Sequence, residues 1–490
     1  MSQNETVVRK RAVQSTISVL SQPGIHSIST TPLLEISTEK GFQTKISVCE
    51  LLPVFLRLAK EDDVESLLDI FDSLATDIVP MVRRSVAEQY GNVISALSNA
   101  ACNDKCSFFV NIGTVLMDDP DQNVQVKAIS VCLLPFLKYW NGESSKFAAS
   151  RIVDYCTNKH SWRIKHAVAC KMGAFLDMLG SDKYAIISSF VNLLSDPESF
   201  VRKEAAAHLY KACCCVQDNH SVSSKLWAEI PELLSDPDPD VRGASVLQCE
   251  SLLNDPALRH NSNRFQDLVK ALKVLLGDQD QSVQSNVVCI FVNSLGTCIP
   301  QSQRDTFLKE LYSRAKDEST SWRVIKTIVE AIPKSAASMQ SSWCVDSGGF
   351  DFFIFTMFHK VSAIRMVACS VINDLEVIFG SEWFSSHVYP LVTKMATSKQ
   401  KYGLRVSSLY AVDAMLRSPR DHFPFASSIV MKLLEDDVPN VRIKAIQTFP
   451  ILSHKAPTED VKVALQNDFN KSFDLEEDHD VLQCRMNVQH

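Results

Sequence analysis

The stretch Asp236-Pro-Asp-Pro-Asp-Val241-Arg242 decides the fold, because close copies of it return along the chain. It joins an acidic turn to an aliphatic anchor, a basic residue and an apolar helical stripe. Other clear copies are Asp77-Ile-Val-Pro-Met-Val82-Arg83, Asp196-Pro-Glu-Ser-Phe-Val201-Arg202 and Asp436-Asp-Val-Pro-Asn-Val441-Arg442. Weaker copies have their anchor at Val8, Thr44, Val124, Ile164, Val283, Val324, Ile364, Leu404 and Val481. A period of about 40 residues is typical of stacked helical hairpins.

Each period holds two apolar stripes, one before the anchor and one that begins at it. Both have the i, i+3/i+4 spacing of an amphipathic helix, and we name these helices A and B. The aspartate ahead of the anchor suits the N-cap of helix B. Prolines in the first stripe predict bent A helices and straighter B helices; they are Pro32, Pro231 and Pro390.

These patterns predict an all-α, right-handed α-solenoid, a superhelix of about thirteen hairpins, as a single body over residues 1–490. The first hairpin is expected to be partial, because Val8-Arg9 comes almost at the start of the chain. The serine- and glycine-rich segment from Met339 to Gly349 is expected to form a longer loop between repeats.

Composition excludes several classes of protein. The chain is 46% hydrophobic and 22% charged, with a formal net charge of -7, which argues against a general nucleic-acid binder. No apolar run approaches the length of a transmembrane helix, so no membrane insertion is expected. The 15 cysteines are scattered and no apolar signal segment opens the sequence. Reduced thiols and a location in the cytoplasm, or in the nucleus, are therefore expected.

No catalytic motif stands out, and the sequence predicts a protein that is not an enzyme and needs no cofactor or metal. Cys213-Cys214-Cys215 and the pair Cys102 and Cys106 are the nearest approach to metal ligands. Adjacent helical residues point in different directions, so three in a row cannot form one tetrahedral site. Small packing residues are the better interpretation of both groups, and the histidines show no ligand spacing.

The recurring aspartate and arginine allow two interpretations. Stacked turns would place the aspartate of one repeat near the arginine of the next, and a ladder of exposed ion pairs would then set the register between repeats. Each exposed pair would contribute only about 0–1 kcal/mol. The alternative is direct contact with a partner, and both can hold at different positions.

Two turns carry a tryptophan where other turns have small or polar residues. They are Ser161-Trp162-Arg163-Ile164-Lys165 and Ser321-Trp322-Arg323-Val324. A tryptophan in a short turn is hard to bury, and exposed tryptophan beside arginine is favoured in interface hot spots. The alternative is a tryptophan that caps its own repeat.

With these residues the chain resembles the scaffold (A-type regulatory) subunit of serine/threonine protein phosphatase 2A, an all-α HEAT-repeat family. The resemblance runs nearly end to end and is most specific at Pro80-Met-Val-Arg-Arg84 and the two Trp-Arg turns. The other segments that carry it are Glu5-Thr-Val-Val-Arg-Lys-Arg-Ala-Val13, Phe379-Gly-Ser-Glu-Trp383 and Val438-Pro-Asn-Val-Arg442.

The resemblance implies which turns bind which partner. Residues 1–300 would bind a regulatory B-type subunit, through Pro80, Met81, Arg83, Arg84, Trp162, Arg163 and Lys165. Residues 301–490 would bind the catalytic subunit, through Trp322, Arg323, Tyr402, Val438, Pro439 and Asn440.

The chain departs from the family in three places. In the family's register it would begin within the third repeat, through biology or because the chain is incomplete. Ser362 stands where the family has an aromatic residue, and the last turn lacks a basic-aromatic pair after Asp480-Val481. The last two changes are expected to weaken docking of the catalytic subunit.

The expected function is therefore a non-catalytic scaffold in a phosphatase heterotrimer. An enzyme with an unrecognised site would need convergent titratable residues in a pocket, which the sequence does not display. Two further alternatives stay open. One is a nuclear-transport HEAT protein of the karyopherin type, which would bind a small GTPase. The other is the regulatory subunit of a sister phosphatase, which differs only in the identity of its partner.

Overall fold

The computed structural model describes residues 6–97, 104–139, 143–178, 183–256, 262–294, 299–397, 399–474 and 476–489. Within these ranges the regular structure is helical, with no strand. The chain divides into two compact units, residues 1–252 and 253–490, and each unit is described by itself.

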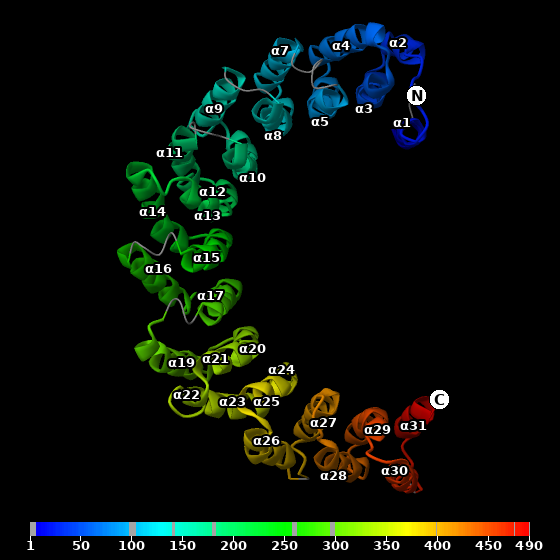
Figure 1. Ribbon diagram of the computed structural model, residues 1–490, viewed down its shortest axis with the longest axis vertical. Helices are drawn as coiled ribbons and strands as arrows, with labels where there is room; N and C mark the ends of the chain where they lie inside the picture. The colour runs from blue at the N-terminus through cyan, green and yellow to red at the C-terminus, as the bar shows by residue number, and fades with distance from the viewer. Residues whose placement is uncertain are drawn as a thin grey trace. The chain divides into compact units, whose positions relative to one another are not determined.

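The first unit is built from alternating A and B helices, and α15 extends two residues beyond it. The A helices are α2 (Thr31–Ser37), α4 (Glu61–Ala75), α7 (Cys106–Met117), α9 (Glu143–Tyr155), α11 (Lys183–Leu194) and α14 (His220–Leu234). The B helices are α1 (Thr6–Leu20), α3 (Phe42–Leu58), α5 (Pro80–Ala96), α8 (Gln122–Tyr139), α10 (Trp162–Met178), α12 (Ser199–Ala206), α13 (Leu209–Cys215) and α15 (Pro239–Asn254). Successive B helices pack on one another and form one layer of the unit, with the A helices as the second layer (Figure 1).

The second unit repeats this arrangement (Figure 1). Its A helices are α16 (Ser262–Leu275), α19 (Gln301–Ala315), α22 (Ser341–Val345), α23 (Gly349–Met357), α26 (Ser381–Met395), α28 (Phe423–Leu434) and α30 (Glu459–Lys471). Its B helices are α17 (Gln281–Asn293), α20 (Trp322–Glu330), α21 (Ile332–Met339), α24 (Ser362–Ser370), α25 (Ile372–Phe379), α27 (Tyr402–Arg417), α29 (Pro439–His454) and α31 (His479–Gln489). The prediction of an all-α fold of stacked helical hairpins is confirmed.

The anchor of each repeat is a core residue. Val82, Val201, Val241 and Val441 are fully buried, at 0% exposure, near the start of their B helices. Burying such a side chain contributes roughly 1.5–3 kcal/mol, so the recurring anchor is a recurring source of stability. Two anchors are exceptions. Val8 is 53% exposed, because α1 instead buries Arg9 and Val13, and Leu404 is half-buried.

The interruptions of the helices differ from the expectation. Pro231 and Pro390 do lie inside A helices, but Pro53, Pro135 and Pro450 lie inside B helices. Three B helices are also broken into two pieces, namely α12/α13, α20/α21 and α24/α25. Pro333, in the first turn of α21, lacks the N–H that a continuous helix would need. The prediction of straighter B helices was therefore wrong.

The segment from Met339 to Gly349 is also not the loop that its composition suggests. It holds the short helix α22, whose Trp343 is fully buried. The indole Nε1 of Trp343 donates to the hydroxyl of Tyr312 at 3.0 Å, and its ring stacks on that of Phe379. Gly349 begins α23 directly against this ring, since a Cβ there would meet Trp343 at 2.2 Å. A single large aromatic residue thus orders a polar segment.

Candidate functional site: the turns between A and B helices

A buried ion pair links each of several turns to the next. Arg202, directly after its anchor, donates from Nε and Nη2 to Asp236 at 2.6 and 2.9 Å. Its Nη1 donates to the carbonyl oxygen of Asp196, in its own turn, at 2.6 Å. Asp236 in turn accepts from the backbone N–H of Asp238 at 2.9 Å. The same forward link recurs as Lys45–Asp77, Arg83–Asp119, Lys165–Asp196, Arg405–Asp436 and Arg442–Glu476.

The ladder is therefore real, but two expectations about it were wrong. The basic residue reaches the acid of the following repeat, whereas the sequence suggested the reverse order. The pairs are also mostly buried, with side-chain exposures of 13% for Arg202 and 6% for Asp236. The hydrogen bond that Arg202 donates to Asp236 raises the pKa of Arg202 above its ordinary value. Such pairs favour one register between adjacent repeats, because a shifted register would leave a buried charge without its partner.

The aspartate orders the turn more often than it caps the helix. Asp77 accepts from the N–H of Val79, and Val79 itself is the N-cap residue of α5. Burial acts to raise the pKa of Asp77, but hydrogen bonds from Lys45 and Val79 outweigh it and hold this pKa below its ordinary value. Asp121 and Asp280 do cap their helices, since each accepts from two N–H groups at the start of α8 or α17.

Both tryptophan turns lack the ionic link to the turn before them, although Lys165 of the first still reaches Asp196 of the next turn. In the repeat that precedes the Trp162 turn, the residue after the anchor is Gln125. In the repeat that precedes the Trp322 turn, it is Gln284. At both, a glutamine that begins the preceding B helix is hydrogen-bonded to the serine before the tryptophan, Gln122 to Ser161 and Gln281 to Ser321. The two turns that the sequence singled out are therefore built alike.

The tryptophans of these turns are partly exposed. Trp162 is 39% exposed and Trp322 is 37% exposed. Each ring lies under the guanidinium of the next residue, with Arg163 at 4.9 Å and Arg323 at 4.8 Å from the ring centroid. The indole and the guanidinium together offer an apolar face and hydrogen-bond donors to a partner.

In the second unit a cavity of about 860 Å³ opens beside Trp322. The ion pair between turns is absent at this place. Ile325 occupies the position after its anchor that corresponds to Arg202, and His359 occupies the position in the next turn that corresponds to Asp236. Like those aspartates, His359 accepts a hydrogen bond from the N–H two residues on, that of Val361, at 3.0 Å. Apolar side chains from α20 and α23 line the cavity, namely Ile325, Ile354, Phe355 and Phe358.

Charged residues surround this apolar lining. Lys316, Lys360 and Lys394 lie on it together with Asp317 and Glu318. Burial, and then the nearby Lys360 and Arg365, lower the pKa of His359 below its ordinary value, so its imidazole is neutral near pH 7. The cavity thus combines an apolar floor, three ammonium groups and two carboxylates, a composition suited to a protein segment.

The other sequence-predicted residues lie on turns, but not all are available to a partner. In the first unit Pro80 begins α5, Met81 is 60% exposed, and Arg84 is exposed beside Glu88. Arg83 and Lys165 are different, because each forms one of the buried ion pairs that link a turn to the next. Their environment favours the structural interpretation of the repeated basic residue.

In the second unit, Trp322 lines the cavity while the other predicted side chains lie on later turns. Tyr402 begins α27 and is 55% exposed. Pro439 begins α29, with Val438 half-buried before it and Asn440 exposed after it. Ser362 begins α24, at the position that Trp322 and Tyr402 occupy in their own helices. The first residue of a B helix is therefore the shared position on this ridge of turns.

One exposed aromatic residue was missed by the sequence analysis. Phe200 is 62% exposed, and its ring centroid lies 6.5 Å from that of Trp162 on the preceding turn. The sequence did contain a signal for it, namely an apolar residue directly before a buried anchor. Met81, which was predicted to bind a partner, holds this same position in its own turn. Trp162 and Phe200 together extend the apolar surface across two repeats.

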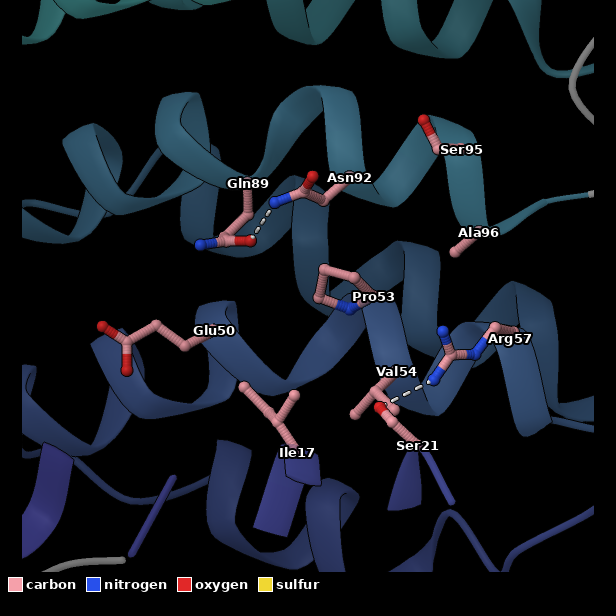
Figure 2. A pocket seen from close by; sticks show the side chains of 10 residues that line it. All are labelled: Ile17, Ser21, Glu50, Pro53, Val54, Arg57, Gln89, Asn92, Ser95 and Ala96. Carbon is pink, nitrogen blue, oxygen red and sulfur yellow. Dashed lines mark hydrogen bonds between the residues drawn. The ribbon is translucent and has the colours of Figure 1, made fainter. Parts of the chain in front are cut away.

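A second groove, of about 340 Å³, lies on the B layer of the first unit across α1, α3 and α5 (Figure 2). Its walls are tied by hydrogen bonds from Asn92 to Gln89 at 2.9 Å and from Arg57 to Ser21 at 3.1 Å. Glu50 is the one carboxylate in its lining, and burial raises the pKa of this group. The lining offers no pair of acidic groups for acid–base chemistry.

The cysteine groups that the sequence analysis interpreted as packing residues are not among the possible metal-ligand groups of the described ranges. Cys213 is buried on α13, Cys214 and Cys215 are half-buried beside it, and Cys102 lies outside the described residues. In the part of the chain that the structure describes, no helix has the length and apolar character needed to cross a membrane.

Comparison with known proteins supports a HEAT-type solenoid. No family model matches the chain. It is 25% identical over 193 residues, 37% of this chain, to the A-type regulatory subunit of protein phosphatase PP2A from Saccharomyces cerevisiae, and the match covers 30% of that protein. The chain superimposes on the solved structures of Kap95p with RanGDP (TM-score 0.65, 10% identity, 100% of this chain and 65% of that one) and of a Kap121p mutant (TM-score 0.61, 12% identity, 93% and 48%).

These likenesses carry different weights. The structural neighbours are HEAT-repeat karyopherins, and at this identity they show the fold alone. The chain spans less than a third of the yeast phosphatase protein that it matches and about half of the Kap121p chain. The relative and the neighbours are non-catalytic kinds of protein that act through protein partners.

Proposed function

We propose that this chain is a non-catalytic scaffold that holds the catalytic subunit and a regulatory subunit of a type 2A serine/threonine protein phosphatase. The observation that carries the proposal is the exposed Trp322–Arg323 turn beside an apolar cavity, in a region where neutral residues replace the ionic rungs. The sequence similarity to an A-type regulatory subunit of PP2A supports the choice of partner.

The catalytic subunit would dock on the turns of the second unit. Trp322 and Arg323 would be the central contact, because tryptophan and arginine beside a desolvated pocket are typical of hot spots. The cavity would receive an apolar side chain of the partner, and Lys316, Lys360 and Lys394 would attract its acidic groups. Tyr402 and Val438–Asn440 would extend the contact along the same ridge.

The regulatory subunit would dock on the turns of the first unit. Met81, Trp162 and Phe200 supply exposed apolar area there, and Pro80, Arg84 and Arg163 flank it. Arg83 and Lys165 would act indirectly, by fixing the register of the turns that carry these contacts. Both partners held on one chain would meet at up to about millimolar effective concentration, without any new contact between them.

A direct binding experiment tests the proposal. The purified chain is titrated with a recombinant type 2A catalytic subunit, and binding is followed by calorimetry. We expect a saturable one-to-one complex, and in a parallel titration weaker binding to the catalytic subunit of a sister phosphatase. Absence of binding to both catalytic subunits at micromolar concentration would contradict the proposal, and a preference for the sister protein would reassign the partner.

A nuclear-transport role is the second candidate, because the superposition on Kap95p covers 100% of this chain. That structure is of a complex with RanGDP, and a karyopherin-like chain would also bind this small GTPase. The same calorimeter separates the two candidates, since the scaffold proposal expects no heat of binding when Ran is titrated into the chain with either nucleotide.

A further inference from the structure

A cluster of metal-binding side chains lies on the B layer of the first unit and shares no residue with either cavity. His166 and Cys170 are one turn apart on α10, and Glu204 faces them from α12 in the next repeat. One ligand atom from each lies within 4.8 Å of the others. The cysteine is exposed, while the histidine and the glutamate are half-buried, so the cluster is open to an ion from solution.

The two separations that involve Cys170 match those between ligands of one tetrahedral ion. The Sγ atom of Cys170 lies 3.6 Å from Nδ1 of His166 and 3.7 Å from Oε2 of Glu204. Metal–sulfur bonds of about 2.3 Å and metal–nitrogen or metal–oxygen bonds of about 2.0–2.1 Å, at tetrahedral angles, place such ligands about 3.5–3.6 Å apart. The ligand atoms of His166 and Glu204 lie within 4.8 Å of one another, and they would need to come to about 3.3 Å for all three atoms to bind one ion.

We propose that His166, Cys170 and Glu204 bind one divalent transition-metal ion of the zinc type, with the fourth coordination position open to solvent. A thiolate, an imidazole and a carboxylate are the three ligand types that Zn²⁺ uses in proteins, and the set excludes Mg²⁺ and Ca²⁺, which prefer all-oxygen sites.

The position of the site indicates what the ion would do. Glu204 lies on α12, one repeat beyond α10, so the ion would cross-link two B helices that already pack together. The ion pair of Lys165 with Asp196 joins the same two repeats at their turns. Metal binding would therefore stiffen the repeats that carry Trp162 and Phe200, because an ion that binds only the folded state stabilises that state.

Without metal, the same groups have a simpler arrangement. The thiol of Cys170 donates to Glu204, and burial together with the Glu204 charge raises the pKa of this thiol to about 11. The hydrogen-bonded cluster is the competing interpretation, and it predicts no stoichiometric binding of metal.

Cobalt(II) separates the two interpretations, because a cobalt–thiolate bond gives a charge-transfer band in the near ultraviolet. The full chain, reduced and freed of metal, is titrated with Co²⁺. We expect the band to saturate at one equivalent, to disappear on addition of Zn²⁺, and to be absent from Cys170→Ser and strongly weakened in Glu204→Gln. Cys289→Ser is the matched control, since Cys289 is also exposed on a B helix, and it should keep the band.

Thermal unfolding provides an independent readout. One equivalent of Zn²⁺ should raise the unfolding temperature of the wild-type chain and of Cys289→Ser, but not that of Cys170→Ser, whose circular dichroism should match that of the wild type. A band that fails to saturate at one equivalent, or that survives in Cys170→Ser, would overturn the proposal. The outcome does not depend on the phosphatase assignment.

Discussion

The hydroxyl of Ser321 donates a hydrogen bond to Oε1 of Gln281 at 2.8 Å, and so joins the N-cap of α20 to the first residue of α17. Gln122 and Ser161 make the same link in the first unit. At both places a neutral amide–hydroxyl bond stands where other repeats have an ion pair with the preceding turn. The tryptophan turns are thus a distinct class of turn, joined to the preceding turn without an ionic link.

The ladder leads to a prediction about stability. Asp236→Asn keeps an oxygen that can accept the hydrogen bond from the backbone N–H of Asp238. It removes the negative charge that pairs with Arg202, and both side chains of this pair are mostly buried. We expect a loss of about 2–3 kcal/mol in the free energy of unfolding, somewhat below the usual cost of deleting a buried partner. Chemical denaturation followed by circular dichroism measures it.

Asp240→Asn is the control for this change, because Asp240 pairs with Lys203 at 66% side-chain exposure. An exposed pair of this kind contributes less than about 1 kcal/mol. Equal losses in the two variants would show that the buried rungs have no special role.

The buried Trp343 leads to a second prediction. Gly349→Ala places a Cβ within 2.2 Å of the indole of a fully buried side chain. Overpacking of this kind costs about 1–3 kcal/mol. Gly91→Ala is the matched control inside a helix, because its Cβ would meet only Pro135 at 3.7 Å. We expect the control to unfold at or above the wild-type temperature, and a tolerated Gly349→Ala would show that α22 and α23 pack differently.

The lowered pKa of His359 leads to a prediction about pH. The folded chain favours the neutral imidazole, which accepts from Val361, while the unfolded chain binds a proton at the ordinary value of about 6.5. The unfolded state then binds more protons as the pH falls from about 6.5 toward the folded pKa, so stability decreases over that interval and is restored above it.

His359→Asn isolates this contribution, because the asparagine oxygen can accept the same hydrogen bond but does not titrate. The unfolding temperature of this variant should fall less than that of the wild type between pH 7 and about pH 5. Parallel curves for the two proteins would mean that His359 is not the group responsible.

Much of the fold could be predicted from the sequence, because the anchor is both periodic and buried. Val82, Val201 and Val441 mark the start of their B helices without reference to distant contacts. The breaks between α24 and α25 and the ordering of α22 by Trp343 were missed, since both depend on packing that has no local signature.

The site could be predicted only in part. The tryptophan turns were visible as departures from the repeat, whereas the direction and burial of the ladder depend on how adjacent repeats stack. The cavity beside Trp322 depends on Ile325 and His359 meeting across two repeats. The His166, Cys170 and Glu204 cluster was missed for the same reason, since Glu204 reaches it from another helix.

Binding of a type 2A catalytic subunit to Trp322→Ala is the sharpest test of the proposed docking of that subunit at the Trp322–Arg323 turn. Trp162→Ala is the matched control, because it removes an equivalent side chain from an equivalent turn of the first unit. We expect Trp322→Ala to bind at least about tenfold more weakly, as for a hot-spot residue, and Trp162→Ala to bind as the wild type does. Calorimetry that gives Trp322→Ala the wild-type affinity, with unchanged circular dichroism, would contradict the account.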